Sequence, residues 1–378
     1  MKGRFHAFDL ARELAARRAL AGLLTTYPAS QTRRFGIDGA LVTTRVLEEL
    51  RRRARQFLPG ERSPAAHVAA YERFDRSTCA WLRADADVFI GWSGASLAAL
   101  QRASSLGLAT WLERGSTHAA WARRKLLAVY DDAGLRPRVA PLELVEREQA
   151  EYALADRIAV PSSFAERTFH AYGVPAAKLV RIPYGVDLDA FRAPATRGSS
   201  DVFRVLFVGA VSVRKGVLTL LDAFRRVPAA KKELVLVGRV EPALRHRLAG
   251  RDSDVRIVGS VPQERLRAHY AAASVFCLPS HEEGLALVLA QAMAAGRAIV
   301  ASHASGAGDL VVDGEHGFLS EDGDVDALTE RLTRLADAPE LAVELGRRGA
   351  LRVASGFAWR DYGDRVQAEL ARLMAARR

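Results

Sequence analysis

The segment Val275-Phe-Cys-Leu-Pro-Ser-His-Glu-Glu-Gly-Leu285 indicates the architecture of this chain. It begins as a short apolar run of strand type and passes through a Pro/Gly turn into the helical pattern of residues 285–295. A strand that leads through a turn into a helix is the repeating unit of a parallel sheet. Ligands bind such sheets at the carboxyl ends of the strands, beside helix N-termini. We therefore predict that the two carboxylates of the turn, Glu282 and Glu283, face a ligand.

The same unit recurs through the second half of the chain, where apolar runs alternate with helical stretches. The predicted strands are 203–209, 234–238, 255–259, 275–279 and 298–302, and the predicted helices between them are 217–227, 242–249, 264–272 and 285–295. Short apolar strands interleaved with helices predict a parallel sheet that is covered on both faces.

The first half is less regular but also has an α/β pattern. Its predicted helices are 9–20 and 42–57, and its predicted strands are 88–90, 108–112 and 158–161. A doubly wound domain normally opens with a strand, whereas residues 1–3 lead almost directly into a helix. We therefore expect the first strand either to be missing from this chain or to lie upstream of it.

The two halves are separated by a segment with the composition of a linker, Ala193-Pro-Ala-Thr-Arg-Gly-Ser-Ser200. The predicted division is a first domain at 1–195, a second domain at 201–354 and a closing helical segment at 355–378. The length of 378 residues suits two domains, and 49% apolar with 26% charged residues is a globular composition.

The composition also predicts where the protein is located and argues against a disulfide and a metal site. No apolar run approaches the roughly 18 residues that span a bilayer, and the first residues do not form a signal peptide, so a cytoplasmic location is predicted. Cys79 and Cys277 lie far apart and without metal-type spacing, which argues against a disulfide or a zinc site. Asp85-Ala-Asp87 precedes a predicted strand instead of closing one, so we interpret it as a turn and not as a metal site.

The chain is basic, with a net charge of +11, and residues 1–195 hold 29 Lys and Arg against 21 Asp and Glu. Such a bias attracts phosphorylated substrates, acidic lipid headgroups or nucleic acid. Nucleic-acid-binding signatures are not apparent, so nucleic acid is not an expected partner.

Five arginines lie close together on the predicted helix 42–57: Arg45, Arg51, Arg52, Arg53 and Arg55. A basic amphipathic helix either covers its own domain or lies on an anionic membrane, so peripheral contact with the inner membrane face is a further expectation.

The segment 207–216 combines the end of a predicted strand with two adjacent cations, Arg214 and Lys215, before a helix. Gly209 lets another group approach the backbone, and cations beside a helix N-terminus suit a diphosphate. The alternative is a solvated Arg–Lys pair. The segment is neither a Walker loop nor a dinucleotide fingerprint.

Glu283 and Gln291 lie eight residues apart, so the loop and the helix after it can both border one crevice. The alternative for Glu283 is a helix cap, because acidic residues are favoured at helix N-termini. His118 follows the predicted strand 108–112 and should lie on a loop at its carboxyl end. A lone histidine is more often structural than functional.

The second half resembles the donor domain of retaining glycosyltransferases of family 4, which have the GT-B architecture of two Rossmann-like domains that face each other across a cleft. The segments that carry this resemblance are 207–216, 234–238, 279–284 with 291–296, and 313–318. The first half is similar to a subset of the same family. Its matching segments are 6–14, 26–28, 113–118, 155–162 and 182–187.

The resemblance implies roles for single residues. Lys215 and Arg214 would hold the donor diphosphate, and Glu283 would lie beside the donor sugar near its anomeric carbon. His118 would contact the sugar from the first domain. Further donor-binding positions are Gly209, Gly284, Leu285 and Gln291, of which Gly284 and Leu285 would offer backbone amides. In this family a last helix crosses back to the first domain, and 361–375 has the matching helical pattern.

Two positions depart from the family pattern. Gln291 stands where the family usually has a second Glu that binds ribose hydroxyls, which an amide can also do. Ala210 stands where many members have Arg, so Arg214 replaces that charge or phosphate affinity is lower.

The expected function is transfer of a sugar from a nucleotide diphosphate sugar to a hydroxyl acceptor, with retention of configuration. The acceptor would be a polysaccharide, a glycolipid or a small metabolite, and the reaction would need no metal and no cofactor. The alternatives are a GT-B phosphorylase, a nucleotide-sugar epimerase, and a non-catalytic sugar or nucleotide binder.

Overall fold

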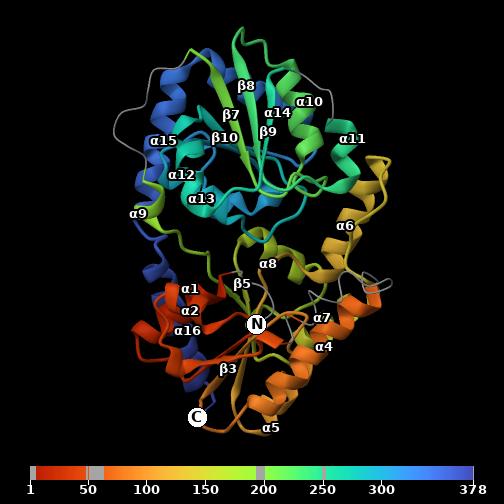
Figure 1. Cartoon of the computed structure of the whole chain (residues 1–378), viewed down its shortest axis with the longest axis vertical. Helices are drawn as coiled ribbons and strands as arrows, with labels where there is room; N and C mark the ends of the chain where they lie inside the picture. Colours follow the sequence, from red (N-terminus) through yellow and green to blue (C-terminus); the bar gives the residue numbers. More distant parts are fainter. Residues whose placement is uncertain (1–5, 48–49, 51–63, 193–200, 249–252, 378) are drawn as a thin grey trace.

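The computed structural model describes residues 6–47, 50, 64–192, 201–248 and 253–377. The chain forms two α/β domains that lie one above the other in Figure 1, and every strand pair in them is parallel. The predicted fold, two domains built on parallel sheets, is therefore confirmed.

The second domain contains one sheet of six strands in the order β12-β11-β10-β7-β8-β9. Its strands are β7 (Phe203–Val208), β8 (Lys232–Val237), β9 (Val255–Gly259), β10 (Val275–Leu278), β11 (Ala298–Ser302) and β12 (Gly317–Ser320). Its helices are α10 (Val217–Arg226), α11 (Arg245–Leu248), α12 (Gln263–Ala272), α13 (Leu287–Ala294), α14 (Val325–Asp337) and α15 (Pro339–Ala354), with 3-10 turns at Pro242–Leu244, His303–Ser305 and Ala307–Asp309. All the strands and helices predicted in this half are present.

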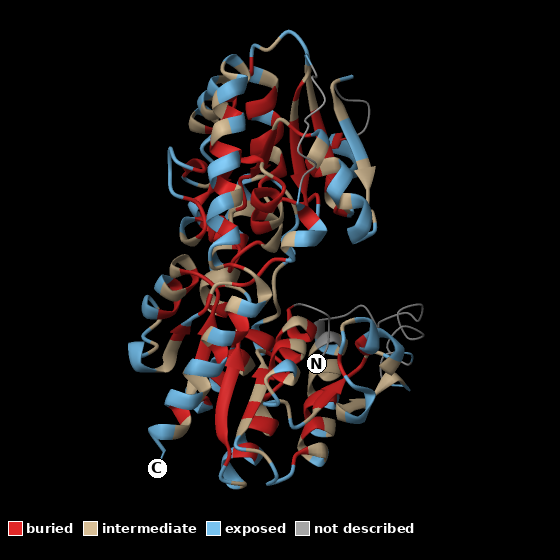
Figure 2. Ribbon diagram, turned by 90° about the vertical axis from the view of Figure 1, so that its left-hand side faces the viewer, coloured by how far each residue is buried: buried red, intermediate tan, exposed pale blue. Residues whose placement is uncertain are grey.

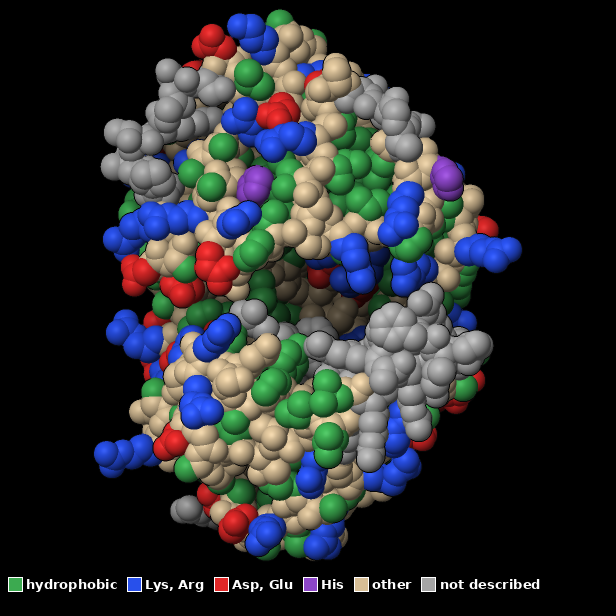
Figure 3. Space-filling model, viewed as in Figure 1, with side chains coloured by type: hydrophobic (Ala, Val, Ile, Leu, Met, Phe, Trp, Pro, Cys, Tyr) green, Lys and Arg blue, Asp and Glu red, His purple; other side chains and the backbone are tan. Residues whose placement is uncertain are grey.

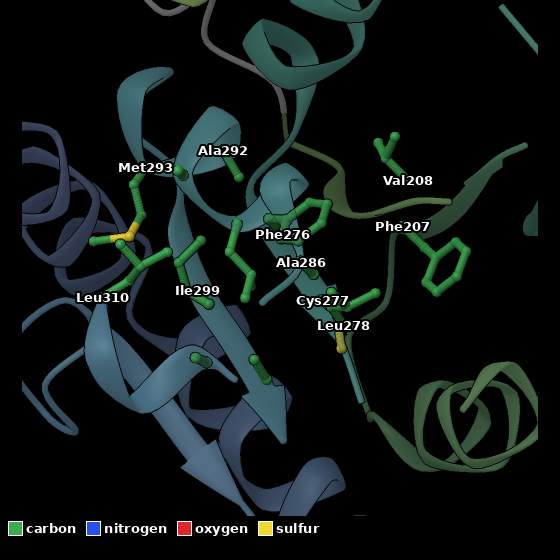
Figure 4. Close-up of a cluster of buried hydrophobic side chains, with 14 of the residues drawn as sticks. Phe207, Val208, Phe276, Cys277, Leu278, Ala286, Ala292, Met293, Ile299 and Leu310 are labelled. Carbon is green, nitrogen blue, oxygen red and sulfur yellow. The ribbon is translucent and has the colours of Figure 1, made fainter. Parts of the chain in front are cut away.

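The core of the second domain lies around β7 and β10. Phe207 and Phe276 are fully buried, and Figure 4 shows them in one cluster with Met293 of α13 and Ile299 of β11. Figure 2 shows the sheet as mostly buried with exposed helix faces outside it. A sheet covered on both faces needs apolar residues along its whole central strand, which explains the continuous apolar runs in the sequence.

The first domain contains two separate sheets, β1-β2 and β3-β4-β5-β6. The strands are β1 (Leu23–Thr25), β2 (Val42–Thr44), β3 (Val88–Trp92), β4 (Ala109–Glu113), β5 (Arg157–Val160) and β6 (Leu179–Arg181). The helices are α1 (Ala7–Ala16), α2 (Ala29–Arg34), α4 (Pro64–Trp81), α5 (Leu97–Ser105), α6 (Ala119–Asp132), α7 (Leu142–Leu154), α8 (Ser163–His170) and α9 (Leu188–Phe191), with 3-10 turns at Gly39–Leu41 and Ala176–Lys178.

One prediction for this half is wrong at its start, although its described residues 46, 47 and 50 are helical. The predicted helix 42–57 opens as strand β2, which pairs in parallel with β1. The β-branched run Val42-Thr43-Thr44 favours a strand, and local propensity there outweighs the apolar spacing on which the prediction relied. Residues 51–63, which include four of the five clustered arginines, lie outside the described residues.

The last helix, α16 (Trp359–Ala375), lies against the first domain. It packs along α1, where the Arg17 guanidinium contacts the Asp364 carboxylate at 2.6 Å. The crossing is tight because a Cβ on Gly363 would lie 2.7 Å from the Cβ of Glu13. Residues 193–200, the predicted linker, lie outside the described residues. Within the described part of the chain, no helix has the length and apolar character that a bilayer crossing requires.

Candidate functional site

The two predicted ligand loops meet where the sheets end toward the other domain. Gly216 ends the loop after β7 with φ +70°, and a Cβ there would lie 1.9 Å from the carbonyl oxygen of Pro279 in the loop after β10. Only glycine permits both that backbone conformation and that approach. The two loops are further joined because the His281 N–H donates to the Arg214 carbonyl at 2.8 Å. Figure 3 shows the molecule hollowed between the two lobes at this level.

The structure brings both predicted cations to the predicted carboxylate. Lys215 Nζ forms an ion pair with Glu283 Oε1, and Arg214 Nη2 lies 3.1 Å from the same oxygen. Arg214 Nη1 also contacts Glu282 Oε2 at 2.7 Å. The Lys215 side chain is 11% exposed and the Arg214 side chain is 35% exposed, and both are paired with carboxylates.

The charges in this cluster shift one another's pKa values. Glu283 raises the pKa of Arg214, although burial opposes this. Burial lowers the pKa of Lys215 more than Glu283 raises it. Burial raises the pKa of Glu282, but Arg214 and two hydroxyl donors outweigh it and bring the pKa to about 2. Glu282 is therefore ionised and held in place, which suits a positioning role.

The first domain supplies those hydroxyls across the domain boundary. Ser116 and Thr117, in the loop after β4, donate to Glu282 Oε1 at 2.6 and 2.5 Å. Ser162 donates to the Gly284 carbonyl at 2.5 Å. A Cβ on Gly284 would lie only 2.5 Å from the Gly115 carbonyl oxygen, so the two backbones touch. The site is thus a contact between loops of both domains.

Two backbone N–H groups remain available beside this contact. Among the residues that the structure describes, the amides of Gly284 and Leu285 have no hydrogen-bond acceptor, whereas those of Glu283 and Ala286 donate to residues 304 and 305. Gly209 has φ +146° and the Lys215 side chain lies 3.6 Å from where its Cβ would be. Free amides next to two cations are the arrangement that binds phosphate or sugar oxygens.

A hollow of about 410 Å³ lies next to the cation loop in the second domain. It is lined at the carboxyl ends of β8 and β9 by Gly238, Arg239, Val240, Arg245, Leu248, Ile257, Gly259 and Ser260. The Glu241 N–H donates to the Val211 carbonyl at 2.9 Å, so the loop that borders this hollow is joined to the loop that carries Arg214 and Lys215.

The His118 ring lies in an aromatic cluster of the first domain. The ring stacks on Tyr172 at 4.5 Å and packs against Tyr152 and Phe169, all in the first domain. Burial, and secondarily Arg114, lowers its pKa to about 4, so the ring is neutral. No partner for its Nδ1 exists among the described residues. Contact of His118 with a sugar stays a prediction.

Gln291 lies on α13, where its side-chain oxygen accepts a hydrogen bond from Tyr270 at 3.0 Å. Its amide nitrogen is left to donate to a ligand, and binding of ribose by Gln291 stays a prediction.

Ala210 is exposed, just after the end of β7. Asp85 and Asp87 lie in the turn before β3, as predicted. No cluster of three or more His, Cys, Asp or Glu side chains in the described ranges has metal-binding geometry.

Sequence reasoning missed the polar residues that position the site. Tyr130 of α6 donates to Glu241 Oε1 at 2.8 Å across the domain boundary, and Arg114 pairs with Glu148 at 2.8 Å beneath the Ser116 loop. The run Arg114-Gly-Ser-Thr117 directly after a predicted strand was an available signal. Nothing in the sequence indicates that Tyr130 and Glu241 meet.

Two family profiles match the chain. The profile described as Glycosyltransferase Family 4 matches residues 4–190, and that described as Glycosyl transferases group 1 matches residues 202–338. A GDP-mannose-dependent alpha-(1-6)-phosphatidylinositol monomannoside mannosyltransferase of Mycolicibacterium smegmatis is 31% identical over 59% of this chain and 63% of that protein. D-inositol 3-phosphate glycosyltransferase 2 of Catenulispora acidiphila is 31% identical over 57% of this chain and 56% of that protein. The chain thus matches less than two thirds of the length of these relatives.

Solved structures share the fold. Sucrose-phosphate synthase from Thermosynechococcus elongatus superposes with a TM-score of 0.68 at 26% identity, covering 85% of this chain and 81% of that one. Anabaena HepE, solved with UDP and glucose, gives a TM-score of 0.70 at 15% identity, covering 97% and 94%. The two profile matches cover most of the chain, and each falls on one of its two domains. The chain belongs to the family 4 glycosyltransferases of GT-B architecture.

Proposed function

We propose that this protein is a retaining glycosyltransferase that moves a sugar from a nucleotide diphosphate sugar to a hydroxyl acceptor. The observation that carries the proposal is the meeting of Arg214, Lys215 and Glu283 beside free backbone amides at the domain boundary. The relatives support it, because those named above are a mannosyltransferase that uses GDP-mannose and an inositol phosphate glycosyltransferase. HepE, which was solved with UDP, shares the fold.

The difficult step in such a transfer is departure of the diphosphate while positive charge develops at the anomeric carbon. Fixed cations on the leaving group stabilise that transition state, so Arg214 and Lys215 are proposed to bind the diphosphate. Glu283 would then exchange its ion pair with Lys215 for a place beside the sugar, where its carboxylate stabilises the developing positive charge. Glu282 would hold Arg214 and the first-domain loop in position.

The hollow next to the cation loop is proposed to take the nucleotide base. A base that packs on Val240 and Ile257 places its diphosphate toward Lys215, since the two loops are hydrogen bonded. Once Glu283 leaves its ion pair, Lys215 and Arg214 can offset the charge of the leaving group, so we propose that transfer needs no metal. Activity that disappears with EDTA and returns with added Mg²⁺ would contradict this part of the proposal.

The test begins with the donor nucleotide. UDP, GDP and ADP are each added to the protein, and the nucleotide that raises the unfolding temperature identifies the base. Turnover of the matching nucleotide sugar is then measured with Lys215→Ala. We expect a loss of about a hundredfold or more, as for removal of another charge-stabilising donor.

Lys231→Ala is the matched control, because Lys231 is a 68% exposed lysine of the same domain. It should keep wild-type turnover. Wild-type turnover in Lys215→Ala, or stabilisation by none of the three diphosphates, would refute the proposed donor site.

A further inference from the structure

Helix α6 of the first domain contacts two carboxylates of the second domain. Lys125 Nζ lies 2.8 Å from Asp322 Oδ2, and the Tyr130 hydroxyl donates to Glu241 Oε1 at 2.8 Å. Figure 1 shows α6 rising from the first domain to the level of α11 in the second domain. Asp322 lies in the turn after β12 and Glu241 in the loop after β8, so one helix reaches two separate loops of the second domain.

The first carboxylate, Asp322, connects α6 to the loop that carries Glu282 and Glu283. Its Oδ2, which Lys125 contacts, also lies 2.9 Å from His281 Nδ1. Burial raises the pKa of Asp322, but hydrogen bonds from His281 and Lys125 outweigh it, so the pKa is lowered. An ionised carboxylate can only accept, so the Nδ1 of His281 carries the proton. Because His281 directly precedes the two glutamates, Asp322 links α6 to their loop.

The second carboxylate, Glu241, connects α6 to the loop that carries Arg214 and Lys215. One of its oxygens accepts from Tyr130, and the other accepts from the Val213 N–H at 3.2 Å. Burial, and then Glu241, raises the pKa of Tyr130, so its hydroxyl stays protonated and is the donor. Val213 directly precedes the two cations. Each ligand loop is therefore joined to α6 through one carboxylate that accepts from both sides.

The two links differ in strength. Tyr130 and Glu241 are buried, and the guanidinium of Arg138, which lies 4.0 Å from Glu241 Oε1, is 61% exposed. Loss of the Tyr130 hydroxyl would leave a buried carboxylate oxygen without its hydroxyl donor, which is costly. The Lys125 side chain is 32% exposed, so water screens its attraction to Asp322. We therefore expect the Tyr130 link to be the stronger one.

We propose that α6 positions both ligand loops, and that Glu241 and Asp322 are the positioning residues through which it acts. Glu241 acts on a backbone N–H of the cation loop, and Asp322 acts on the ring that precedes the two glutamates. The inference rests on the proposed function, because these loops are the proposed donor site. A donor that binds the loops as α6 holds them must also stabilise the α6 contacts, since such coupling is reciprocal.

The first experiment measures the affinity of the nucleoside diphosphate that stabilises the wild-type protein. Tyr130→Phe and Lys125→Met change the first domain, and calorimetric titration gives the dissociation constant of each variant. We expect about tenfold weaker binding in Tyr130→Phe. We expect about threefold weaker binding in Lys125→Met, and Lys125→Arg should recover most of that loss because it keeps the cation. If Tyr130→Phe does not fold, the Lys125 variants carry the test.

A double variant tests whether Lys125 acts through Asp322. Asp322→Asn combined with Lys125→Met should bind the diphosphate no more weakly than Asp322→Asn alone, because both changes break the same link. Asp326→Asn is the matched control, since Asp326 is a carboxylate of the same domain whose side chain is 89% exposed. It should keep wild-type affinity. Losses that simply add in the double variant would show that Lys125 does not act through Asp322, which would overturn that link.

A third contact of α6 separates positioning from simple tethering of the domains. Arg247 of α11 donates to the Ala133 carbonyl at the end of α6 at 2.7 Å, and Arg247 does not belong to a ligand loop. Arg247→Ala therefore breaks a contact between the same helix and the same domain. It should keep wild-type affinity. A loss as large as that of Tyr130→Phe would mean that α6 only tethers the domains, and would overturn the proposal.

Hydrogen exchange of the unliganded protein tests the positioning without a donor. Exchange should be about tenfold faster at Val213 in Tyr130→Phe and at His281 in Lys125→Met, while residues 203–208 of β7 should not change. Unchanged exchange at both amides, or wild-type affinity in Tyr130→Phe, overturns the proposal. Failure of every diphosphate to bind the wild-type protein would instead refute the proposed function, and the exchange rates would then decide the positioning by themselves.

Discussion

The two domains share one architectural plan but differ at its centre. In the second domain β7 joins the two halves of a six-stranded sheet, and its residues 205–207 are essentially inaccessible to solvent. In the first domain the same position is a cavity between two smaller sheets. The flanking layers keep their places around that cavity, since α1 packs along α16 and Leu24 of β1 packs with Phe74 of α4.

The domains also divide the site between them. The second domain supplies Arg214, Lys215, Glu282 and Glu283 from loops on its uninterrupted sheet. The first domain supplies neutral donors, such as Ser116 and Ser162, that hold those loops. The charged residues of the site thus lie on the second domain, which has the more continuous core. The residues that hold their loops in position lie on the first domain.

The largest expected difference between the two cores is the loss of stability when one leucine in each is replaced by alanine. Leu206→Ala in β7 should cost about 4–5 kcal/mol, because a close-packed sheet centre cannot collapse around the void. Leu24→Ala in β1 should cost only about 2 kcal/mol, because Leu24 already borders the cavity. Denaturant unfolding combined with hydrogen exchange assigns each loss to its domain. Equal losses would mean that the two cores are equally well packed.

The contact between the domains can be tested at Gly284. Gly284→Ala places a Cβ about 2.5 Å from the Gly115 carbonyl, so the loops must separate. We expect a cost of about 1–3 kcal/mol and a clear loss of donor turnover. Gly308→Ala is the control, because its Cβ would meet nothing within 4 Å. A Gly284→Ala protein that matches this control in both measurements would show that the loops are not in contact.

The smallest expected effect is a pH dependence that belongs to the first domain. Burial lowers the pKa of His118 to about 4, so the unfolded chain binds a proton between about pH 6.5 and 4 that the folded chain does not. Stability should therefore fall on acidification through that window, by on the order of 2 kcal/mol. His118→Phe should flatten the curve there. Glu282, with its pKa near 2, contributes only below about pH 4.5. An unchanged curve in His118→Phe would contradict burial of a neutral ring.

The sequence predicted the second domain better than the first for a physical reason. Strands such as 275–278 are buried on both faces and appear as unbroken apolar runs, which few other structures produce. Strand β2 is three residues long and half-buried, so its pattern was masked by the apolar spacing of the helix predicted over 42–57. Short edge strands carry too few residues for periodicity to identify them.

The candidate site was predictable where its chemistry is local. Arg214 and Lys215 are neighbours in sequence, and Glu283 occupies a strand-to-helix turn, so each was visible as a motif. The positioning contacts were not predictable, because Tyr130 and Glu241 come from different domains and meet only once the lobes are packed. For His118 the motif was recognised in the sequence, but the aromatic side chains that surround its ring could not be predicted from it.

The ion pairs of Lys215 and Arg214 have one more consequence. Glu282 and Glu283 act as resident counter-ions, so the charges of Arg214 and Lys215 are balanced within this cluster. A diphosphate enters by exchange, taking over cations that a carboxylate releases. Monovalent salt anions gain little from such an exchange, and buried pairs are weakly screened. The cleft therefore selects for ligands that deliver two linked negative charges at once.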